Sequence, residues 1–223
     1  MECTMVQALA DMTLDELKPI LARVVPRHAG FDGWGEKAVE SAAAELDIDP
    51  AIARLVFGGN RVAMIDAWFA SIDEDMLTHL PPEKMSGMKV REKISALVET
   101  RLDLAMPHRE ALRRAAAILA FPANAPRGVQ LGWRAADAMW RAAGDKATDY
   151  NHYTKRAILG SVYAATLAVF LDDQSEGLSV TRAFLGRRID GIMRFEKAKA
   201  KVTKVSPIFS PARFIGRLRY PAR

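Results

Sequence analysis

The chain has little of the chemistry that many enzymes and metal proteins need. Its 223 residues include one cysteine, Cys3, which excludes a disulfide framework and a cysteine-based metal site and makes a reducing compartment the expected setting. The four histidines, at positions 28, 79, 108 and 152, are scattered, and none follows a glutamate by three residues as in helical di-metal carboxylate sites. We therefore expect no bound metal and no cofactor.

The sequence also lacks a recognisable set of catalytic residues. Asp172 and Asp173 are adjacent acids that could exchange protons, but no nucleophile-base pair, phosphate-binding loop or metal cluster accompanies them. The need of a helix end for caps explains both acids better. We therefore expect a protein that is not an enzyme on its own.

Strand patterns and long apolar runs are rare as well. Alternating runs of Val, Ile and Thr do not occur, whereas apolar residues recur at intervals of three and four almost throughout, as in amphipathic helices. No stretch approaches the roughly 20 uninterrupted apolar residues of a membrane span, and residues 1–11 contain acids but no basic signal-peptide region. We expect an all-α protein that neither crosses a membrane nor carries a secretion signal.

Capping signals divide the chain into about nine to ten helices. Thr13 forms a capping box with Glu16, Asp49 followed by Pro50 starts a short third helix, and Asn60 caps the next one. The first helix is expected to end near Pro26 to Gly30, and the others are expected at 35–46, 50–57, 61–79, 88–105, 107–121, 126–143, 149–172 and 178–203.

Charge is distributed unevenly along these helices. The net charge is +5, but residues 191–223 carry nine Lys or Arg and one acid, Glu196, so this segment is +8 while residues 1–190 are −3. Basic charge confined to one end predicts an anionic partner there, either membrane lipid or nucleic acid.

Residues 1–60 form the first of three predicted parts, followed by a helical body at 61–205 and a basic segment at 206–223. Three short helices with a tight turn before the third resemble the head of tetracycline-repressor-type regulators, whose third helix enters the DNA major groove. Here the head has five Lys or Arg against ten acids, and its third helix offers only Arg54. Because DNA affinity depends on phosphate neutralisation, we expect no nucleic-acid binding, and a ligand-responsive transcriptional regulator is the alternative.

The most distinctive stretch is WRAADAMWRAAGDKATDYNHYTKR, residues 133–156, followed by the acids at 172–173 and the run at 184–189. These motifs resemble the ninth coenzyme Q biosynthesis protein family, and the resemblance covers about residues 14–200. It implies a lipid-binding accessory protein that takes a polyprenyl quinone intermediate from the membrane and presents it to the demethoxyubiquinone hydroxylase. It also implies a peripheral place on the inner membrane, facing the cytoplasm in bacteria or the matrix in mitochondria.

The turn inside this stretch has the features of a recognition surface. Gly144 ends one helix and Thr148 or Asp149 caps the next, which gathers polar and aromatic side chains at one exposed corner. Helical spacing after the cap places a histidine, a tyrosine and an arginine on one face of the helix. Tyrosine and arginine, together with tryptophan, are the residue types that contribute most to binding energy at interfaces. The predicted partner-binding residues are Asp137, Trp140, Gly144, Asp145, Asp149, His152, Tyr153 and Arg156.

A structural alternative applies to the same corner. Asp149 would then only cap, Trp140 and Tyr153 would only pack, and Arg156 would form an ordinary surface ion pair. His152 also departs from the tryptophan that the resembled family commonly has at this position. A smaller, partly polar ring offers less apolar contact, which bears on the strength of the partner contact and not on its location.

A lipid-binding body needs an apolar cavity that its own side chains do not fill. Flexible or large side chains are available as liners, although a methionine or aromatic stripe at helical spacing is more often core. We expect an isoprenoid quinone or a phospholipid as the ligand, and the predicted lipid-binding residues are Met106, Trp133, Met139, Leu159, Tyr163, Phe170 and Met193.

The last segment has the pattern of a helix that lies on a membrane surface. From Pro211, apolar residues recur at i, i+3, i+4 and i+7, with arginines on the opposite face. The alternatives are packing on the body, packing on a second subunit of a homodimer, or an unstructured basic tail. The predicted membrane-binding residues are Phe209, Arg213, Phe214, Ile215, Arg217 and Leu218.

Overall fold

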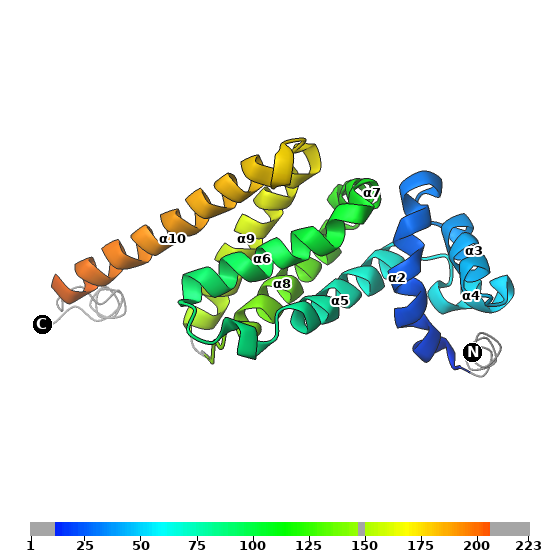
Figure 1. The fold of residues 1–223 in the computed structure, drawn as a ribbon, viewed down its shortest axis with the longest axis horizontal. Coiled ribbons are helices and arrows are strands. Elements are labelled where there is room, and N and C mark those ends of the chain that lie inside the picture. The colour runs from blue at the N-terminus through cyan, green and yellow to red at the C-terminus, as the bar shows by residue number, and fades with distance from the viewer. Residues whose placement is uncertain (1–11, 147–149, 206–223) are drawn as a thin grey trace, which may run out of the picture.

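The described part of the chain is helical throughout. The computed structural model describes residues 12–146 and 150–205, which form nine α-helices and three short 3-10 helices without a β-strand (Figure 1). The all-α prediction is confirmed. The elements are α2 (Leu14–Asp32), α3 (Glu36–Glu45), α4 (Pro50–Phe57), α5 (Arg61–His79), η1 (Pro82–Met85), α6 (Val90–Ala105), η2 (Met106–His108), α7 (Arg109–Ala120), α8 (Ala125–Ala142), α9 (Tyr150–Asp172), η3 (Glu176–Leu178) and α10 (Ser179–Val205).

Side-chain caps explain where the first helices begin. The Thr13 hydroxyl accepts the backbone N–H of Glu16 at 3.4 Å, and the Glu16 carboxylate accepts the backbone N–H of Thr13 at 2.8 Å. Asp49 accepts a backbone N–H in the first turn of α4 at 2.7 Å, and Asn60 does the same in α5 at 3.1 Å. Each side chain satisfies a donor that has no partner inside its helix, so the three predicted caps are confirmed.

The first helix is longer than predicted. α2 continues through Pro26 and ends at Asp32, beyond the predicted end between Pro26 and Gly30. Proline removes one backbone hydrogen bond, but Pro26 is buried in a helix that packs against α3, α5 and α7, and this packing outweighs the loss. The helix stops at Gly33, whose φ of +78° lies in the region that favours glycine.

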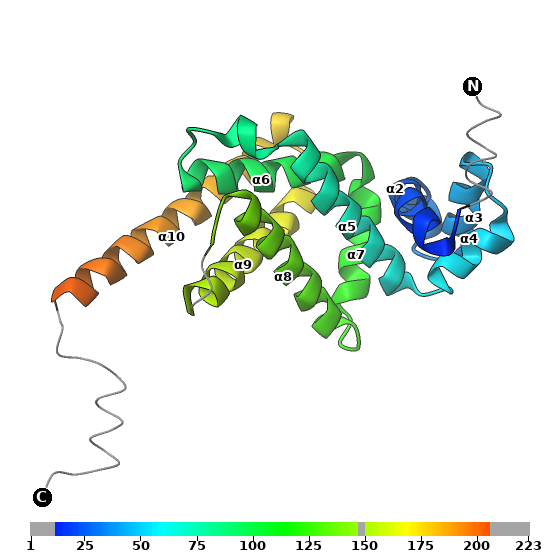
Figure 2. The same ribbon diagram turned by 90° about the horizontal axis from the view of Figure 1, so that it is seen from below.

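The molecule is elongated, with the head and the end of α10 at opposite extremes. The head helices α2, α3 and α4 lie together at one end, and α5 leads from them into the body (Figures 1 and 2). Within the body, α8 packs along α9, while α10 packs on α9 and α6. The C-terminal turns of α10 extend past the rest of the body in both views.

Aromatic residues join the head to the body. The indole nitrogen of Trp34 donates to the carbonyl of Ala111 at 2.9 Å, and its ring lies 5.3 Å from that of Trp68. The Trp68 ring in turn meets His108 edge-on at 6.3 Å. Burial, together with the charge of Arg27, lowers the pKa of His108, which favours the neutral imidazole. The hydrophobic core is therefore continuous across residue 60.

One described helix is long and apolar enough to cross a membrane. Residues His152–Asp172 of α9 span 21 residues with a mean hydropathy of 1.2. α9 packs against α8 and α10, contacts α6 and α7, and supplies Leu159 and Phe170 to the core. A third of the residues in this window are buried, and the core helix of a folded domain can have the same length and composition as a membrane span.

Candidate functional site

An apolar groove opens between α7, α8 and α9, with contributions from α5 and α6. Its volume is about 670 Å³, within the range of small-molecule sites. The larger side chains that line it include Phe69, Leu112, Leu119, Val129, Trp133 and Leu167.

Small residues create the space in this groove. Gly128 and Gly132 of α8 and Ala157, Gly160 and Ala164 of α9 line its walls. A Cβ at Gly160 would lie 3.6 Å from the carbonyl oxygen of Gly132, so the two helices approach closely there. A Cβ at Gly132 would meet no atom within 4 Å, so this position borders open space.

Two buried polar side chains, Arg101 and Tyr163, also line the groove. Arg101 is 1% exposed; its Nε donates to the Tyr163 hydroxyl at 3.2 Å, and its Nη1 pairs with Asp73. Burial lowers the pKa of Arg101, but Tyr163 and Asp73 outweigh this effect and hold the pKa above its ordinary value. Arg134 pairs with Asp73 and Asp66, so the charged cluster joins α5, α6, α8 and α9.

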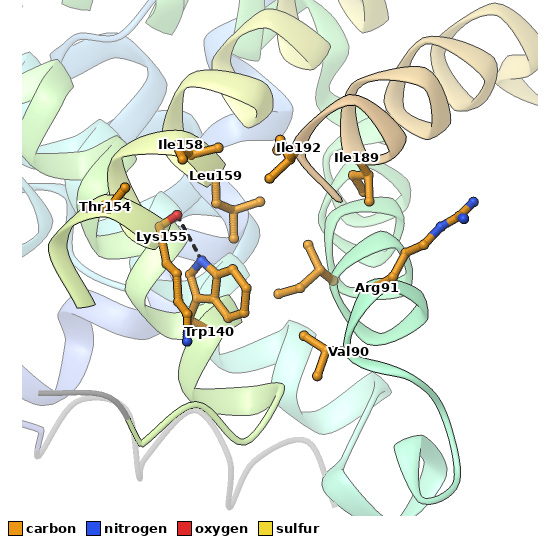
Figure 3. Close-up of a pocket in the computed structure, with 10 residues that line it drawn as sticks. Val90, Arg91, Trp140, Thr154, Lys155, Ile158, Leu159, Ile189 and Ile192 are labelled. Carbon is orange, nitrogen blue, oxygen red and sulfur yellow. Dashed lines mark hydrogen bonds between the residues drawn. The ribbon is translucent and has the colours of Figure 1, made fainter. Parts of the chain in front are cut away.

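A second, smaller cavity lies between α6, α9 and α10. Its volume is about 270 Å³, and apolar side chains make up most of its lining. Figure 3 shows the Trp140 indole on one side and Ile189 and Ile192 of α10 on the other. α10 therefore closes one side of the cavity and Trp140 closes another.

Hydrogen bonds hold the predicted partner corner in place. Trp140 Nε1 donates to the carbonyl of Lys155 at 3.0 Å. The Lys155 ammonium lies 5.3 Å from the centre of the Trp140 ring and 2.7 Å from Asp145 Oδ1. At the end of α8, Gly144 has a φ of +90°, which turns the chain toward Asp145. Trp140 is thus half-buried within the corner and does not project from it.

Arg156 lies inside this corner. Its side chain is 1% exposed, with Nε donating to Asp137 Oδ1 at 2.6 Å and Nη1 donating to Asp145 Oδ2 at 3.0 Å. Burial lowers the pKa of Arg156, but the hydrogen bonds to both carboxylates outweigh it and raise the pKa above its ordinary value. The structure therefore corrects the structural alternative for Arg156, which forms no ordinary surface ion pair, while its predicted partner contact stays a prediction.

Tyr153 is the exposed aromatic side chain of the corner. It is 62% exposed, and its ring lies 6.1 Å from Trp133 and 5.1 Å from His152. Asp149, which was also predicted to bind the partner, lies outside the described residues. The recognition role of the corner stays a prediction, and Tyr153 is its most accessible ring.

The acid pair after α9 serves as a cap. Asp173 accepts the backbone N–H of Ser175 at 2.9 Å and that of Thr181 at 2.8 Å, in addition to both hydroxyls. These hydrogen bonds hold the pKa of Asp173 well below its usual range. Asp172 pairs with Arg113 at 3.0 Å. The predicted capping role is confirmed for Asp173, and so strongly bound a carboxylate is a poor proton donor or acceptor near neutral pH.

Residues 125–196 match the family model described as COQ9. The chain is 33% identical over 177 residues to the "ubiquinone biosynthesis protein COQ9, mitochondrial" of Rattus norvegicus, a match that covers 76% of this chain and 55% of the relative. The Homo sapiens protein of the same name is also 33% identical, over 76% of this chain and 54% of its own length. The chain is a homologue of the COQ9 proteins.

This chain thus spans about half the length of the COQ9 relatives from rat and human that it matches. The match extends to the "probable ubiquinone biosynthesis protein coq9, mitochondrial" of Dictyostelium discoideum, at 26% identity over 82% of this chain and 62% of the relative. The resemblance found in the sequence motifs is confirmed.

A solved structure supports the predicted fold. The crystal structure of the TetR transcriptional regulator from Nitrosomonas europaea ATCC 19718 aligns with a TM-score of 0.62, covering 79% of this chain and 97% of that chain at 23% identity. At this identity the likeness concerns the fold alone, and the predicted tetracycline-repressor-like fold is confirmed.

The COQ9 match encloses both features described above. Residues 125–196 contain α8, α9 and the first two-thirds of α10, so they include two walls of the groove and the whole of the corner at 137–156. The walls that α5, α6 and α7 supply lie before the matched segment.

The predicted lipid-binding residues of this COQ9 homologue fall in several places. Trp133 and Tyr163 line the groove, whereas Leu159 lines the smaller cavity. Met139 and Phe170 are fully buried and line neither space, and their contact with lipid stays a prediction. A large side chain at a helix face that points inward fills volume instead of bordering a void.

The remaining predicted residues lie elsewhere. Met106 is exposed in η2, where its sulfur accepts from Arg109 at 3.5 Å, and it lines neither space. The side chain of Met193 lies outside the described residues, as do all six predicted membrane-binding residues at 209–218.

Sequence reasoning missed the glycines and alanines of the groove. A signal was present: Gly128 and Gly132 are four residues apart inside a predicted helix, where each glycine costs about 1 kcal/mol relative to alanine. Glycine retained inside a helix points to a packing or functional reason.

Proposed function

We propose that this COQ9 homologue is a lipid-binding accessory protein of ubiquinone biosynthesis. It takes a polyprenyl quinone intermediate from the membrane and presents it to the demethoxyubiquinone hydroxylase, which carries out the chemistry. The observation that carries the proposal is the apolar groove of about 670 Å³, two of whose walls belong to the COQ9 segment.

The shape and lining of the groove suit an elongated apolar ligand. Its walls are mostly Ala, Gly and Leu, and burying hydrocarbon against them yields roughly 25 cal/mol for each Å² removed from water. The relatives are named for ubiquinone biosynthesis, which supports a quinone intermediate as the ligand.

The corner and the basic C-terminal segment complete the proposed role. The hydroxylase contact is assigned to the exposed Tyr153 and its neighbouring rings, because an exposed aromatic side chain is a typical interface anchor. Membrane contact is assigned to residues 206–223, whose basic and apolar residues suit an anionic lipid surface. The names of the relatives place those proteins in mitochondria. For this chain we propose the inner membrane, with peripheral attachment.

Use of the head as a DNA reader is disfavoured by its charges. Residues 1–60 have ten acids against five basic residues, and the single basic residue of α4, Arg54, pairs with Glu40 at 3.1 Å. The exposed face of α4 otherwise offers Ile52 and Leu55, which do not neutralise phosphate.

Filling the groove tests the proposal. Gly132→Phe places a ring in the open space beside α8, and Gly186→Phe in α10 is the matched control, because a Cβ there also meets no atom within 4 Å and the residue lines neither cavity. We expect the unaltered chain and Gly186→Phe to bind a prenylated quinone by fluorescence quenching, and Gly132→Phe to lose at least tenfold in affinity. Equal binding by all three proteins would contradict the assignment of the groove.

A further inference from the structure

The polar end of the groove has hydrogen-bond donors without acceptors. Tyr163 is 8% exposed and its oxygen accepts from Arg101 Nε, while no described residue accepts the proton of the Tyr163 hydroxyl. Arg101 uses Nε for Tyr163 and Nη1 for Asp73, and no described residue accepts from its Nη2. Both side chains line the groove.

Two other polar side chains of the groove, Ser161 and Arg156, already donate to described residues. The Ser161 hydroxyl donates to the carbonyl of Ile158 at 2.7 Å. Arg156 donates to Asp137, Asp145 and the carbonyl of His152. Because no described residue accepts the Tyr163 proton, the Arg101–Tyr163 pair is a place in the lining where a ligand can supply an acceptor oxygen.

The charge of the pair indicates which acceptor fits. Arg101 already pairs directly with Asp73, which it shares with Arg134, and the rest of the lining is apolar apart from Ser161, Trp133 and the paired Arg156. A phosphate buried there would have to lose its hydration without an unpaired cation to compensate it. An uncharged carbonyl or ether oxygen carries no such penalty.

We propose that the Tyr163 hydroxyl, held in place by Arg101, donates a hydrogen bond to an uncharged acceptor oxygen on the head of the bound lipid, such as a quinone carbonyl. The apolar chain of the lipid then lies along the glycine- and alanine-lined walls of α8 and α9. This inference rests on the proposed function and deepens it, because it selects neutral, oxygen-bearing heads over anionic ones.

The test compares a ligand that carries acceptor oxygens with one that carries none. A decyl-substituted benzoquinone is titrated beside decylbenzene, which keeps the ring and the chain but has no acceptor. Tyr163→Phe removes the donor and keeps the ring, and Ser161→Ala is the matched control that removes a hydroxyl committed to the backbone. We expect Tyr163→Phe to weaken quinone binding about two- to tenfold and to leave decylbenzene unchanged, with no effect of Ser161→Ala.

A measurement on the unaltered chain covers the case in which Tyr163→Phe does not fold, since it leaves Arg101 Nε without its acceptor. The infrared carbonyl band of the bound quinone should shift to lower wavenumber than in hexane, as a hydrogen-bonded carbonyl does. An unshifted band would overturn the inference, as would equal quinone binding by Tyr163→Phe.

The outcomes separate this inference from the proposed function. If the unaltered chain binds neither probe, the proposed function fails and the inference fails with it. If it binds both and only the effect of Tyr163→Phe is missing, the inference alone fails. Tighter binding of phosphatidylglycerol than of the quinone, lost in Tyr163→Phe, would overturn the choice of a neutral head.

Discussion

At the scale of single residues, two buried arginines connect the helices of the body. Arg101 joins α6 to α5 and α9 through Asp73 and Tyr163, and Arg156 joins α9 to α8 and the following turn through Asp137 and Asp145. Removing one partner of a buried pair leaves the other charge without compensation, at a cost of about 3–5 kcal/mol. The direct role of these arginines is therefore to stabilise the fold and to hold neighbouring helices in position.

Arg156→Ala should destabilise the fold. We expect its free energy of unfolding in urea to fall by about 3 kcal/mol, because Asp137 and Asp145 lose the buried cation between them and keep only the more exposed Arg141 and Lys155. Arg141→Ala is the matched control: Arg141 also pairs with Asp137, at 2.8 Å, but is largely exposed, so its loss should cost no more than about 1 kcal/mol. Equal costs for the two variants would contradict the buried role of Arg156.

His108 should make stability depend on pH near neutrality. Its pKa is lowered in the fold by burial and by Arg27, so the contribution of the neutral ring is complete above its unfolded pKa of about 6.5 and is lost as the pH falls through that value toward the folded pKa. We expect the unfolding free energy to drop from about pH 7.5 to 5.5 more steeply in the unaltered chain than in His108→Gln. Other titrating groups are common to both proteins, and parallel curves would contradict this assignment.

At the scale of helices, local signals were sufficient to place most elements. The caps at Thr13, Asp49 and Asn60 and the Pro-Gly breaks act within one turn of chain, and the helices follow them closely. The end of α2 was missed because Pro26 is stabilised by contacts with helices distant in sequence, which no local signal reports.

The groove could not be predicted in the same way, because it is defined by missing volume. Met139 and Phe170 carry the flexibility and size of pocket liners, yet both fill the core. Gly132 has no side chain to suggest a site, yet it borders the open space. Whether a side chain fills a space or borders it depends on how the helices pack, so composition and periodicity cannot decide it.

A substitution at the corner should weaken partner binding and leave lipid binding unchanged. We expect Tyr153→Ala to keep the melting temperature and the quinone affinity, because the ring is largely exposed, and to weaken hydroxylase binding at least tenfold in calorimetry. Phe31→Ala, which removes an exposed ring on the head, is the matched control and should change neither property. Loss of quinone binding with retained hydroxylase binding would overturn the assignment of the corner.

The basic segment should bind membranes by charge as well as by apolar contact. Reversing Arg213 and Arg217 to Glu should weaken co-sedimentation with vesicles that contain phosphatidylglycerol by more than tenfold, since each cation near an anionic surface contributes about 1 kcal/mol. Binding to purely zwitterionic vesicles should change little. An unchanged partition on anionic vesicles would support packing of this segment on protein instead.

At the scale of the whole molecule, the head, the helices of the groove and the end of α10 lie in different places. The head and the end of α10 lie at opposite extremes, and α8 and α9 lie between them (Figures 1 and 2). The groove and the corner share these two helices, so one rigid pair carries both the ligand site and the partner site. The fold is that of a TetR regulator, and residues 1–60 of this chain carry ten acids against five basic residues.

The most direct test is mass spectrometry of the protein purified from its own cells, in the native state and after extraction with organic solvent. We expect the unaltered protein to carry an isoprenoid quinone, or a precursor of one, at close to one molecule per chain. The Gly132→Phe variant purified in parallel should carry none. Unaltered protein that carries no lipid would contradict the central claim.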